Sequence, residues 1–211
     1  MEDGQAKKAK SAIIFVSTCE RTALISGILT QLGVANVALH SLLTQNRRLA
    51  SLAKFKSQQC RVLVATDVAS RGLDIPSVDL VLNCELPRRS EDYIHRVGRT
   101  ARAGRSGHAI TLVTQYSFQV FQELESFLKI RMTAYGGYKN GYDDGEVELL
   151  KTRVQPAIRE GKVQIKEADL KKGHRKRKGG KYDPLDDSEQ TGILDTFSRK
   201  TSGKKGKKKR K

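Results

Sequence analysis

The chain has 211 residues, of which 37% are hydrophobic, and its mean hydropathy is -0.52. This length suits one ordinary domain with extensions, and no run of about 18 apolar residues is present that would form a membrane-spanning helix. The formal net charge of +17 favours a polyanionic partner, of which nucleic acid is the most abundant in cells. Residues 1–10 are polar and lysine-rich, so we expect neither a secretory signal nor a membrane partner.

Apolar runs alternate with amphipathic stretches through the first two thirds of the chain. In chain order we predict a strand at 12–16, a helix at 21–32 that Thr18 caps, a strand at 37–39, a helix at 47–55, strands at 62–65 and 80–82, a short helix at 93–97, a strand at 110–113 and a helix at 118–128. Such apolar strands, mostly followed by helices, predict an α/β fold with a parallel sheet covered on both faces. Right-handed crossovers would bring the strand-to-helix loops to one edge, where such sheets bind ligands.

Composition divides the chain into four segments. They are a flexible N-terminus at 1–10, the α/β domain at 11–130, a weakly structured helical extension at 131–170 and a basic disordered tail at 171–211. The extension has room for one or two helices around Pro156. The tail holds 16 Lys and Arg against 5 Asp and Glu, too much charge to bury an apolar core. Cys19, Cys60 and Cys84 fit no zinc or disulfide pattern, and we expect reduced intracellular thiols.

The segment at 65–75, ATDVASRGLDI, follows an apolar strand with a loop of small residues. Hydroxyls and backbone amides at the carboxyl end of a strand suit a phosphate group, and Thr66 and Ser70 supply such hydroxyls. Asp74 follows Gly72 and offers a carboxylate that suits a ribose hydroxyl. The alternative interpretation is an ordinary solvated turn.

The segment at 93–107, YIHRVGRTARAGRSG, carries an arginine every third residue, at Arg96, Arg99, Arg102 and Arg105. Planar guanidinium groups bind phosphate oxygens through two hydrogen bonds and can offset the charge that develops during phosphoryl transfer. Glycines interrupt the run, which argues against the alternative of a solvated basic helix face. His95 taken alone is more typical of a packed core histidine.

A third, weaker signal combines AIIFVST at 12–18 with QNRR at 45–48. Thr18 lies just beyond a strand end and Arg48 lies near a helix start, so both could touch a nucleic-acid backbone. Taken singly, each residue is as well explained by helix capping or solvation.

Together these segments resemble the motifs of the C-terminal RecA-like domain of DEAD-box ATP-dependent RNA helicases. AIIFVST resembles motif IV, QNRR the Q-x-x-R element, ATDVASRGLDI motif V and YIHRVGRTARAGR motif VI, in the same order. The resemblance covers roughly residues 11–130 and implies a RecA-like fold. It implies RNA-backbone contacts by Thr18, Arg48, Thr66 and Arg71. It implies ATP contacts by Gly72, by Asp74 at the ribose, and by Arg99 and Arg102, as arginine fingers, at the phosphates. It implies coupling of the two sites through Asp67, His95 and Arg96.

The resemblance also implies components that this sequence lacks. A DEAD-box ATPase needs a Gly-Lys-Ser/Thr loop and an Asp-Glu-Ala-Asp motif, and neither is present in the sequence. We therefore expect a fragment that does not hydrolyse ATP alone and that needs a first RecA-like domain, which would hold ATP with Mg²⁺. The start at Met1, ten residues before the first strand, favours the same interpretation.

Smaller similarities narrow or qualify the family. The LHS, LAKFKS and LVTQY stretches resemble the ribosome-assembly branch, which implies pre-ribosomal particles as partners. The Lys- and Arg-rich tail resembles nuclear or nucleolar targeting signals, although a generic polyanion-binding tail fits equally well. Ser41-Leu42 replaces the common Gly-Asp, and Ala101 replaces the usual motif VI glycine; because the change in volume is small, we expect the loop to survive.

Two other function classes remain open from the sequence. One is a non-enzymatic RNA-binding or assembly module, in which the basic tail binds RNA and the domain serves as a docking platform. The other is a related superfamily-2 enzyme such as a DNA-remodelling ATPase. The sequences ASRGLDI and HRVGRTAR argue against this second class.

Overall fold

The computed structural model describes residues 9–102, 104–134 and 144–177. Five strands form one parallel sheet in the order β2-β3-β1-β4-β5. They are β1 (Ala12–Phe15), β2 (Asn36–Leu39), β3 (Val62–Ala65), β4 (Leu80–Asn83) and β5 (His108–Thr111). The predicted α/β fold with a parallel sheet is therefore confirmed. The last strand lies earlier than predicted, because its pairing with β4 begins at His108 opposite Leu80.

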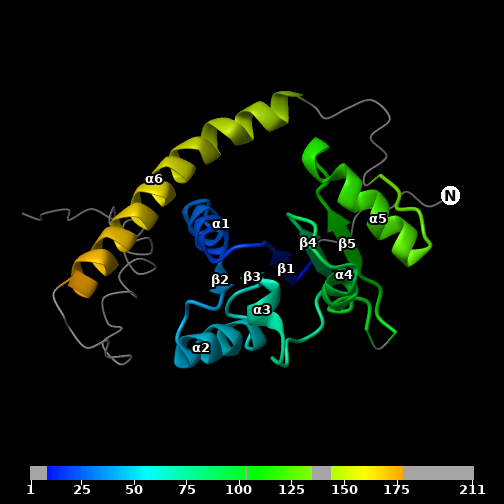
Figure 1. Cartoon of the computed structure of the whole chain (residues 1–211), viewed down its shortest axis with the longest axis horizontal. Coiled ribbons are helices and arrows are strands. Elements are labelled where there is room, and N and C mark those ends of the chain that lie inside the picture. The colour runs from blue at the N-terminus through cyan, green and yellow to red at the C-terminus, as the bar shows by residue number, and fades with distance from the viewer. Residues whose placement is uncertain (1–8, 103, 135–143, 178–211) are drawn as a thin grey trace, which may run out of the picture.

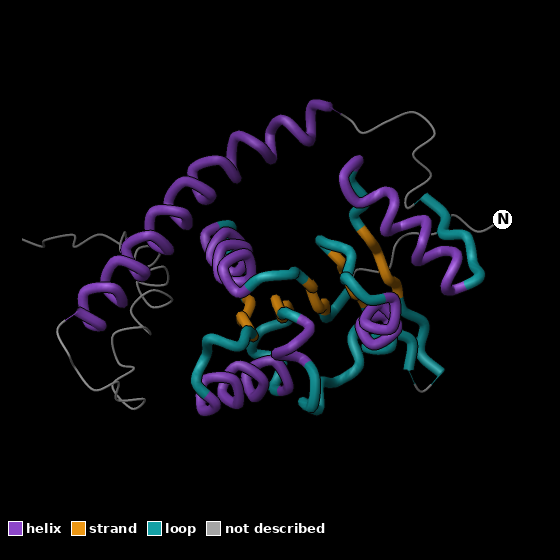
Figure 2. The backbone as a smooth tube through the Cα atoms, viewed as in Figure 1, coloured by secondary structure: helices purple, strands orange, loops and turns teal. Residues whose placement is uncertain are grey.

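Helices cover both faces of this sheet (Figure 1; Figure 2). The first, α1 (Cys19–Gln31), lies on one face, and α2 (Gln45–Lys56) and α4 (Ser90–Val97) lie on the other. The chain continues through the 3₁₀ turn η1 (Gln115–Ser117) into α5 (Phe118–Leu128). Within the described residues, no helix is long and apolar enough to cross a membrane.

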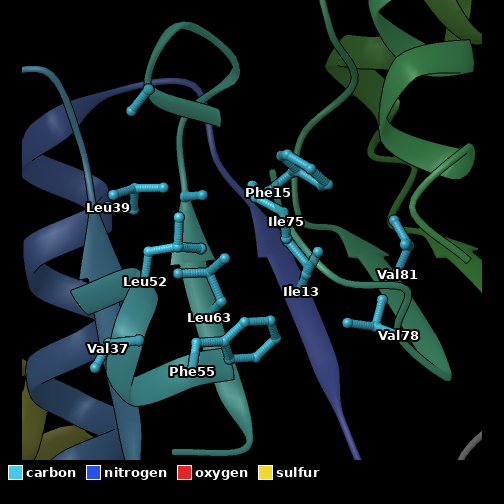
Figure 3. Close-up of a cluster of buried hydrophobic side chains, with 12 residues drawn as sticks. Ile13, Phe15, Val37, Leu39, Leu52, Phe55, Leu63, Ile75, Val78 and Val81 are labelled. Carbon is cyan, nitrogen blue, oxygen red and sulfur yellow. The ribbon is translucent and has the colours of Figure 1, made fainter. Parts of the chain in front are cut away.

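The main core lies between the sheet and α2, and strand register explains its composition. Side chains alternate between the two faces of a strand, so residues in register point to the same side. Ile13 lies level with Leu63 on one neighbouring strand and with Val81 on the other, and all three are fully buried. Leu52 and Phe55 of α2 pack onto this face (Figure 3).

The structure departs from the predicted loop after β3. Instead of an irregular loop, the chain forms one helical turn, α3 (Asp67–Ser70), directly after Thr66. The Ser70 hydroxyl donates to the Asp67 carbonyl at 3.0 Å, which uses the short polar side chain to close the turn. The helical turn determines which residues of this segment point inward.

The last described element, α6 (Asp144–Arg177), is a single helix that includes Pro156 and packs against α1. One or two helices were predicted around this proline, and the helix runs past residue 170, where the tail was expected to begin. The contact uses small residues, since Ala157 is buried and Gly161 faces Leu24. The remainder of the expected tail, 178–211, lies outside the described residues, as does most of the expected N-terminus.

Candidate functional site

The strand ends bring several of the predicted site segments to one edge of the sheet, whereas Arg99 lies beside Val78, ahead of β4. Phe15 lies in register with Ala65 on β3 and with Asn83 on β4. Because all the strands are parallel, the residues that follow these three positions emerge at the same carboxyl edge. That edge therefore gathers the loop after β1, the α3 turn and the loop after β4.

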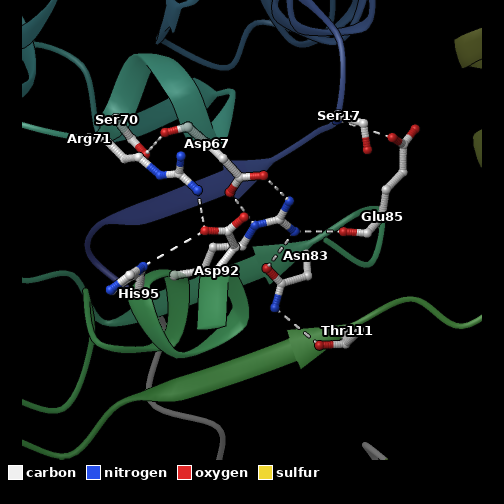
Figure 4. Close-up of polar contacts among 10 residues, drawn as sticks. Ser17, Asp67, Ser70, Arg71, Asn83, Glu85, Asp92, His95 and Thr111 are labelled. Carbon is white, nitrogen blue, oxygen red and sulfur yellow. Dashed lines mark hydrogen bonds and ion pairs between the residues drawn. The ribbon is translucent and has the colours of Figure 1, made fainter. Parts of the chain in front are cut away.

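Arg96, a motif VI arginine, is buried at this edge and is only 1% exposed. Its Nε and Nη2 donate to the two carboxylate oxygens of Asp67 at 2.6 and 2.7 Å, and its Nη1 donates to Asn83 at 3.2 Å and to the Glu85 carbonyl at 2.6 Å (Figure 4). The guanidinium also lies 5.1 Å from the centre of the Phe15 ring, within cation–π distance. The alternative of a solvated basic face is therefore wrong for this residue.

These contacts make the Arg96–Asp67 pair a buried link between two segments. A buried charge is tolerated only when it is paired and hydrogen-bonded, and removing one partner leaves the other uncompensated. The pair joins α4 to the α3 turn, and the family resemblance implies a coupling role for both of its residues. Because the guanidinium is enclosed, it is placed to hold these segments rather than to bind a ligand.

A second, more exposed network lies beside it. Arg71 pairs with Asp92, and His95 Nδ1 lies 3.8 Å from the same carboxylate (Figure 4). The His95 side chain is 69% exposed, so the interpretation as a packed core histidine is wrong. Sequence reasoning missed Asp92, although its place in the first turn of α4, three residues before His95, was the available signal.

Asp74, the expected ribose-binding residue, has a side chain that is 91% exposed. Its carboxylate accepts a hydrogen bond from Lys56 Nζ at 2.6 Å, and this hydrogen bond, together with the charge of Lys56, lowers the pKa of Asp74. Lys56 lies in the last turn of α2 and was not identified from the sequence, because the contact joins segments that only the fold brings together.

Arg99 lies within electrostatic reach of both Asp74 and Arg102. The pKa of Arg99 is lowered, mainly by burial and to a smaller extent by the positive charge of Arg102. The negative charge of Asp74 opposes both effects. Arg102 Nε donates to the Gly98 carbonyl, which holds its guanidinium back along the end of α4. Two like charges thus lie within electrostatic reach of each other, an arrangement that an anion between them would stabilise.

The expected RNA-contacting residues differ in accessibility. Thr18 is exposed and caps α1, where its Oγ1 accepts from the Arg21 amide at 3.2 Å and its hydroxyl proton is left to donate. Arg48 donates to the Ala69 carbonyl at 3.1 Å, which links α2 to the α3 turn. Thr66 is 5% exposed, and its Oγ1 has no hydrogen-bond partner among the described residues.

At Ala101, which replaces the usual motif VI glycine, backbone conformation matters more than side-chain volume. Gly72 and Gly104 adopt φ of 69° and 73°, in the left-handed region that suits glycine. Ala101 adopts φ of 54° in the same region. The loop does form, as expected, but the methyl group costs about 1 kcal/mol there through its clash with backbone, an effect that comparing volumes overlooks.

Known proteins match both the sequence and the fold. The family described as helicase conserved C-terminal domain matches residues 3–104. The chain is 48% identical over 179 residues to "ATP-dependent RNA helicase DDX47" of Drosophila melanogaster, covering 85% of this chain and 34% of that protein. It is 47% identical over 172 residues to "ATP-dependent rRNA helicase rrp3" of Emericella nidulans, covering 82% of this chain and 36% of that protein. The solved C-terminal domain of the DEAD-box protein Dbp5 superposes with a TM-score of 0.56 at 35% identity, covering 60% of this chain and 74% of that one.

The chain belongs to the DEAD-box RNA helicase family. Its sheet is the RecA-like sheet of that family's C-terminal domain, which confirms the resemblance and the fold. It spans only 34% and 36% of the two curated relatives' lengths. Among the described residues of this DEAD-box domain, no three His, Cys, Asp or Glu side chains are grouped to hold a metal ion.

Proposed function

We propose that this domain supplies half of an ATP site and half of an RNA-backbone site in an ATP-dependent RNA helicase. The grouping of Arg99, Arg102 and Asp74 carries the proposal, because two mutually repelling guanidiniums beside an exposed carboxylate match a phosphate chain and a ribose hydroxyl. A first RecA-like domain would complete the site and would hold Mg²⁺.

At the ATP half, Asp74 would accept a ribose hydroxyl while Gly72 keeps the neighbouring backbone clear of side-chain bulk. Arg99 and Arg102 would approach the phosphates when the two domains close. Phosphoryl transfer spreads negative charge over the equatorial oxygens, and a guanidinium that meets them in the transition state lowers the barrier. ATP itself supplies the phosphoryl group.

At the RNA half, Thr18 would donate its hydroxyl proton to a phosphate oxygen at the start of α1. Arg48, Thr66 and Arg71 complete the proposed set, although Thr66 must become accessible for direct contact. Hydroxyls, amides and guanidiniums recognise the sugar-phosphate backbone rather than the bases. Sequence-independent binding of single-stranded RNA is the expected result.

The Arg96–Asp67 pair would couple the two halves. It ties the α3 turn, which follows Thr66, to α4, whose far end leads to Arg99. Arg71, Asp92 and His95 form a second connection between the same segments. Domain closure around ATP would then reposition the RNA-contacting loops as a unit and separate a short duplex.

An ATPase measurement on a chimera tests the arginine fingers. The 211-residue chain replaces the aligned segment of the Drosophila relative, and RNA-stimulated ATP hydrolysis is measured. We expect Arg102→Ala to lower turnover by about a thousandfold, because the guanidinium acts mainly in the transition state. Nucleotide binding by the variant should remain measurable.

Arg105→Ala is the matched control for this experiment. Arg105 continues the same arginine spacing and is exposed. Loss of a non-specific positive charge would affect both variants alike, whereas the proposal requires only Arg102→Ala to lose turnover. Full turnover by Arg102→Ala would reject the role of Arg102.

The biological setting that we propose is pre-ribosomal RNA processing in the nucleus, at the nucleolus. It is supported by the similarity to a protein named as an rRNA helicase and by the Lys- and Arg-rich tail sequence. Pre-ribosomal particles are the corresponding proposed partners.

A further inference from the structure

Glu85 lies in the loop after β4 and joins several segments at the carboxyl edge of the sheet. Its Oε2 accepts a hydrogen bond from the Ser17 backbone amide at 3.1 Å (Figure 4). Its Oε1 pairs with Arg21. Its side chain is 22% exposed. One carboxylate therefore binds both the loop after β1 and the first turn of α1.

These two contacts flank Thr18. Ser17 precedes the cap residue Thr18. The backbone amide of Arg21 donates a hydrogen bond to the Thr18 hydroxyl. Glu85 holds the Ser17 amide on one side of Thr18 and the Arg21 guanidinium on the other. These two contacts restrict the backbone that orients the Thr18 hydroxyl. Without Glu85, the Ser17 amide loses its carboxylate partner at the point where the chain leaves β1.

The backbone of Glu85 is anchored independently of its side chain. Its carbonyl accepts from Arg96 Nη1 at 2.6 Å, and the preceding Cys84 amide donates to the Phe15 carbonyl at 3.0 Å. Arg96 is in turn fixed by Asp67, so the Glu85 carboxylate extends from a rigid base. A side chain held in this way can set the position of a loop.

We propose that Glu85 is a positioning residue for RNA binding: its carboxylate holds the Ser17–Thr18 loop in the conformation that contacts the RNA backbone. This inference rests on the proposed function, because it needs RNA to bind at Thr18. Glu85 contacts neither RNA nor nucleotide itself and acts through Ser17 and Arg21.

Whether removal of the Glu85 carboxylate weakens or strengthens RNA binding separates a positioning role from a simple charge effect. A carboxylate near an RNA site repels phosphate, so removing an uninvolved one should strengthen binding slightly. A positioning residue gives the opposite result, because its loss disorders the loop.

The experiment measures binding of a single-stranded oligouridine of about ten nucleotides by the full chain. Amide chemical shifts of Ser17 and Thr18 are followed by NMR, so that binding at this loop is separated from binding to the basic tail. We expect Glu85→Ala to weaken binding at the loop by about tenfold or more, the loss typical of one hydrogen bond to a charged group. Glu85→Gln keeps an acceptor for the Ser17 amide but loses the charge that pairs with Arg21, so it should bind more tightly than Glu85→Ala.

Two further variants complete the design. Glu85→Asp keeps the charge but is one methylene shorter, so it should bind weakly like Glu85→Ala; it also serves if Glu85→Ala does not fold. Glu91→Ala removes an exposed carboxylate from α4 and should bind as well as the wild type or better. Thermal unfolding of each variant identifies any loss that comes from stability alone.

The outcomes distinguish the inference from the function on which it rests. Absence of RNA-induced shifts at Ser17 and Thr18 in the wild-type chain would contradict the proposed RNA site, and the inference with it. Clear wild-type shifts with unchanged or tighter binding by Glu85→Ala and Glu85→Asp would overturn the positioning role alone.

Discussion

Arg96 and Arg99 come from one short segment yet have opposite surroundings. Arg96 is enclosed and bonded to Asp67, Asn83 and the Glu85 carbonyl. Arg99 lies beyond the end of α4, near Arg102 and Asp74, where like charges repel. The two directions differ because α4 ends at Val97, between the two residues, so Arg99 no longer follows the helical path that turns Arg96 inward. Arginines of one regular repeat thus lie in two different environments.

At the same scale, the Lys56–Asp74 contact gives a pH prediction. We expect Lys56→Met to raise the pKa of Asp74 towards that of a free aspartate, because Lys56 both donates a hydrogen bond and supplies positive charge. Since the folded-state pKa is lowered, the pair contributes to stability above the unfolded pKa, and the contribution is lost as the pH falls through the folded value. NMR titration of the Asp74 carboxyl carbon measures the change.

Lys54→Met is the control for this titration. Lys54 is an exposed lysine in the same last turn of α2, and its substitution removes an equal charge. An equal rise of the Asp74 pKa in both variants would show a general field effect rather than the specific contact.

At the scale of elements, helix starts and helix packing determine how the site is held. Thr18 and Thr44 cap α1 and α2 through their side chains, and both helices begin beside site loops. The long α6 packs on the side of α1 that faces away from the sheet (Figure 1). Across this contact, the Gln31 side chain donates a hydrogen bond to Glu160 at 2.8 Å. The contact with α6 therefore supports α1, whose N-cap residue is Thr18.

We expect Ala157→Glu to disrupt the packing of α6 on α1. Ala157 is 3% exposed, and an unpaired carboxylate there would be buried or would force the helix away. A loss of at least about 2 kcal/mol in unfolding free energy is the expected size for burying an unpaired charge. Chemical denaturation measures this loss.

Gln155→Glu provides the comparison, since it adds the same group at an exposed position of α6. It should leave the unfolding free energy within about 0.5 kcal/mol of the wild type, as surface substitutions usually do. Equal destabilisation by the two variants would contradict the proposed dependence on the buried contact.

At the scale of the whole molecule, the net charge of +17 adds a sequence-independent component to RNA binding. Residues 178–211 contribute 11 Lys and Arg against 5 Asp and Glu. Deleting these residues should lower the affinity for single-stranded RNA about tenfold or more at low salt and should flatten its salt dependence, because fewer counterions are released. Fluorescence anisotropy across a salt series measures both quantities.

The same deletion examines the alternative of a non-enzymatic module that binds RNA through its tail. Under the proposed function, the truncated chain still gives RNA-induced shifts at Thr18. Complete loss of RNA binding, together with an inactive chimera, would favour the tail-binding module instead.

Local pattern was sufficient for much of the fold. Apolar strands are recognisable because a sheet buried on both faces needs them, and β3 and α5 lie at the predicted residues. The motif segments were also apparent, because their glycines, hydroxyls and arginines stand out from ordinary helix and strand composition. The predicted roles of the site residues stay predictions.

By itself the sequence determined the α/β class, the family and the segments that meet at the carboxyl edge. Only the tertiary structure decided which side chains are enclosed and which are exposed: it buried Arg96, exposed His95, paired Asp74 with Lys56 and placed Glu85 beside Ser17. Periodicity and propensity are local properties of the chain. Contacts between residues far apart in sequence, such as Ser17 and Glu85, depend on strand order and register, which no single segment specifies.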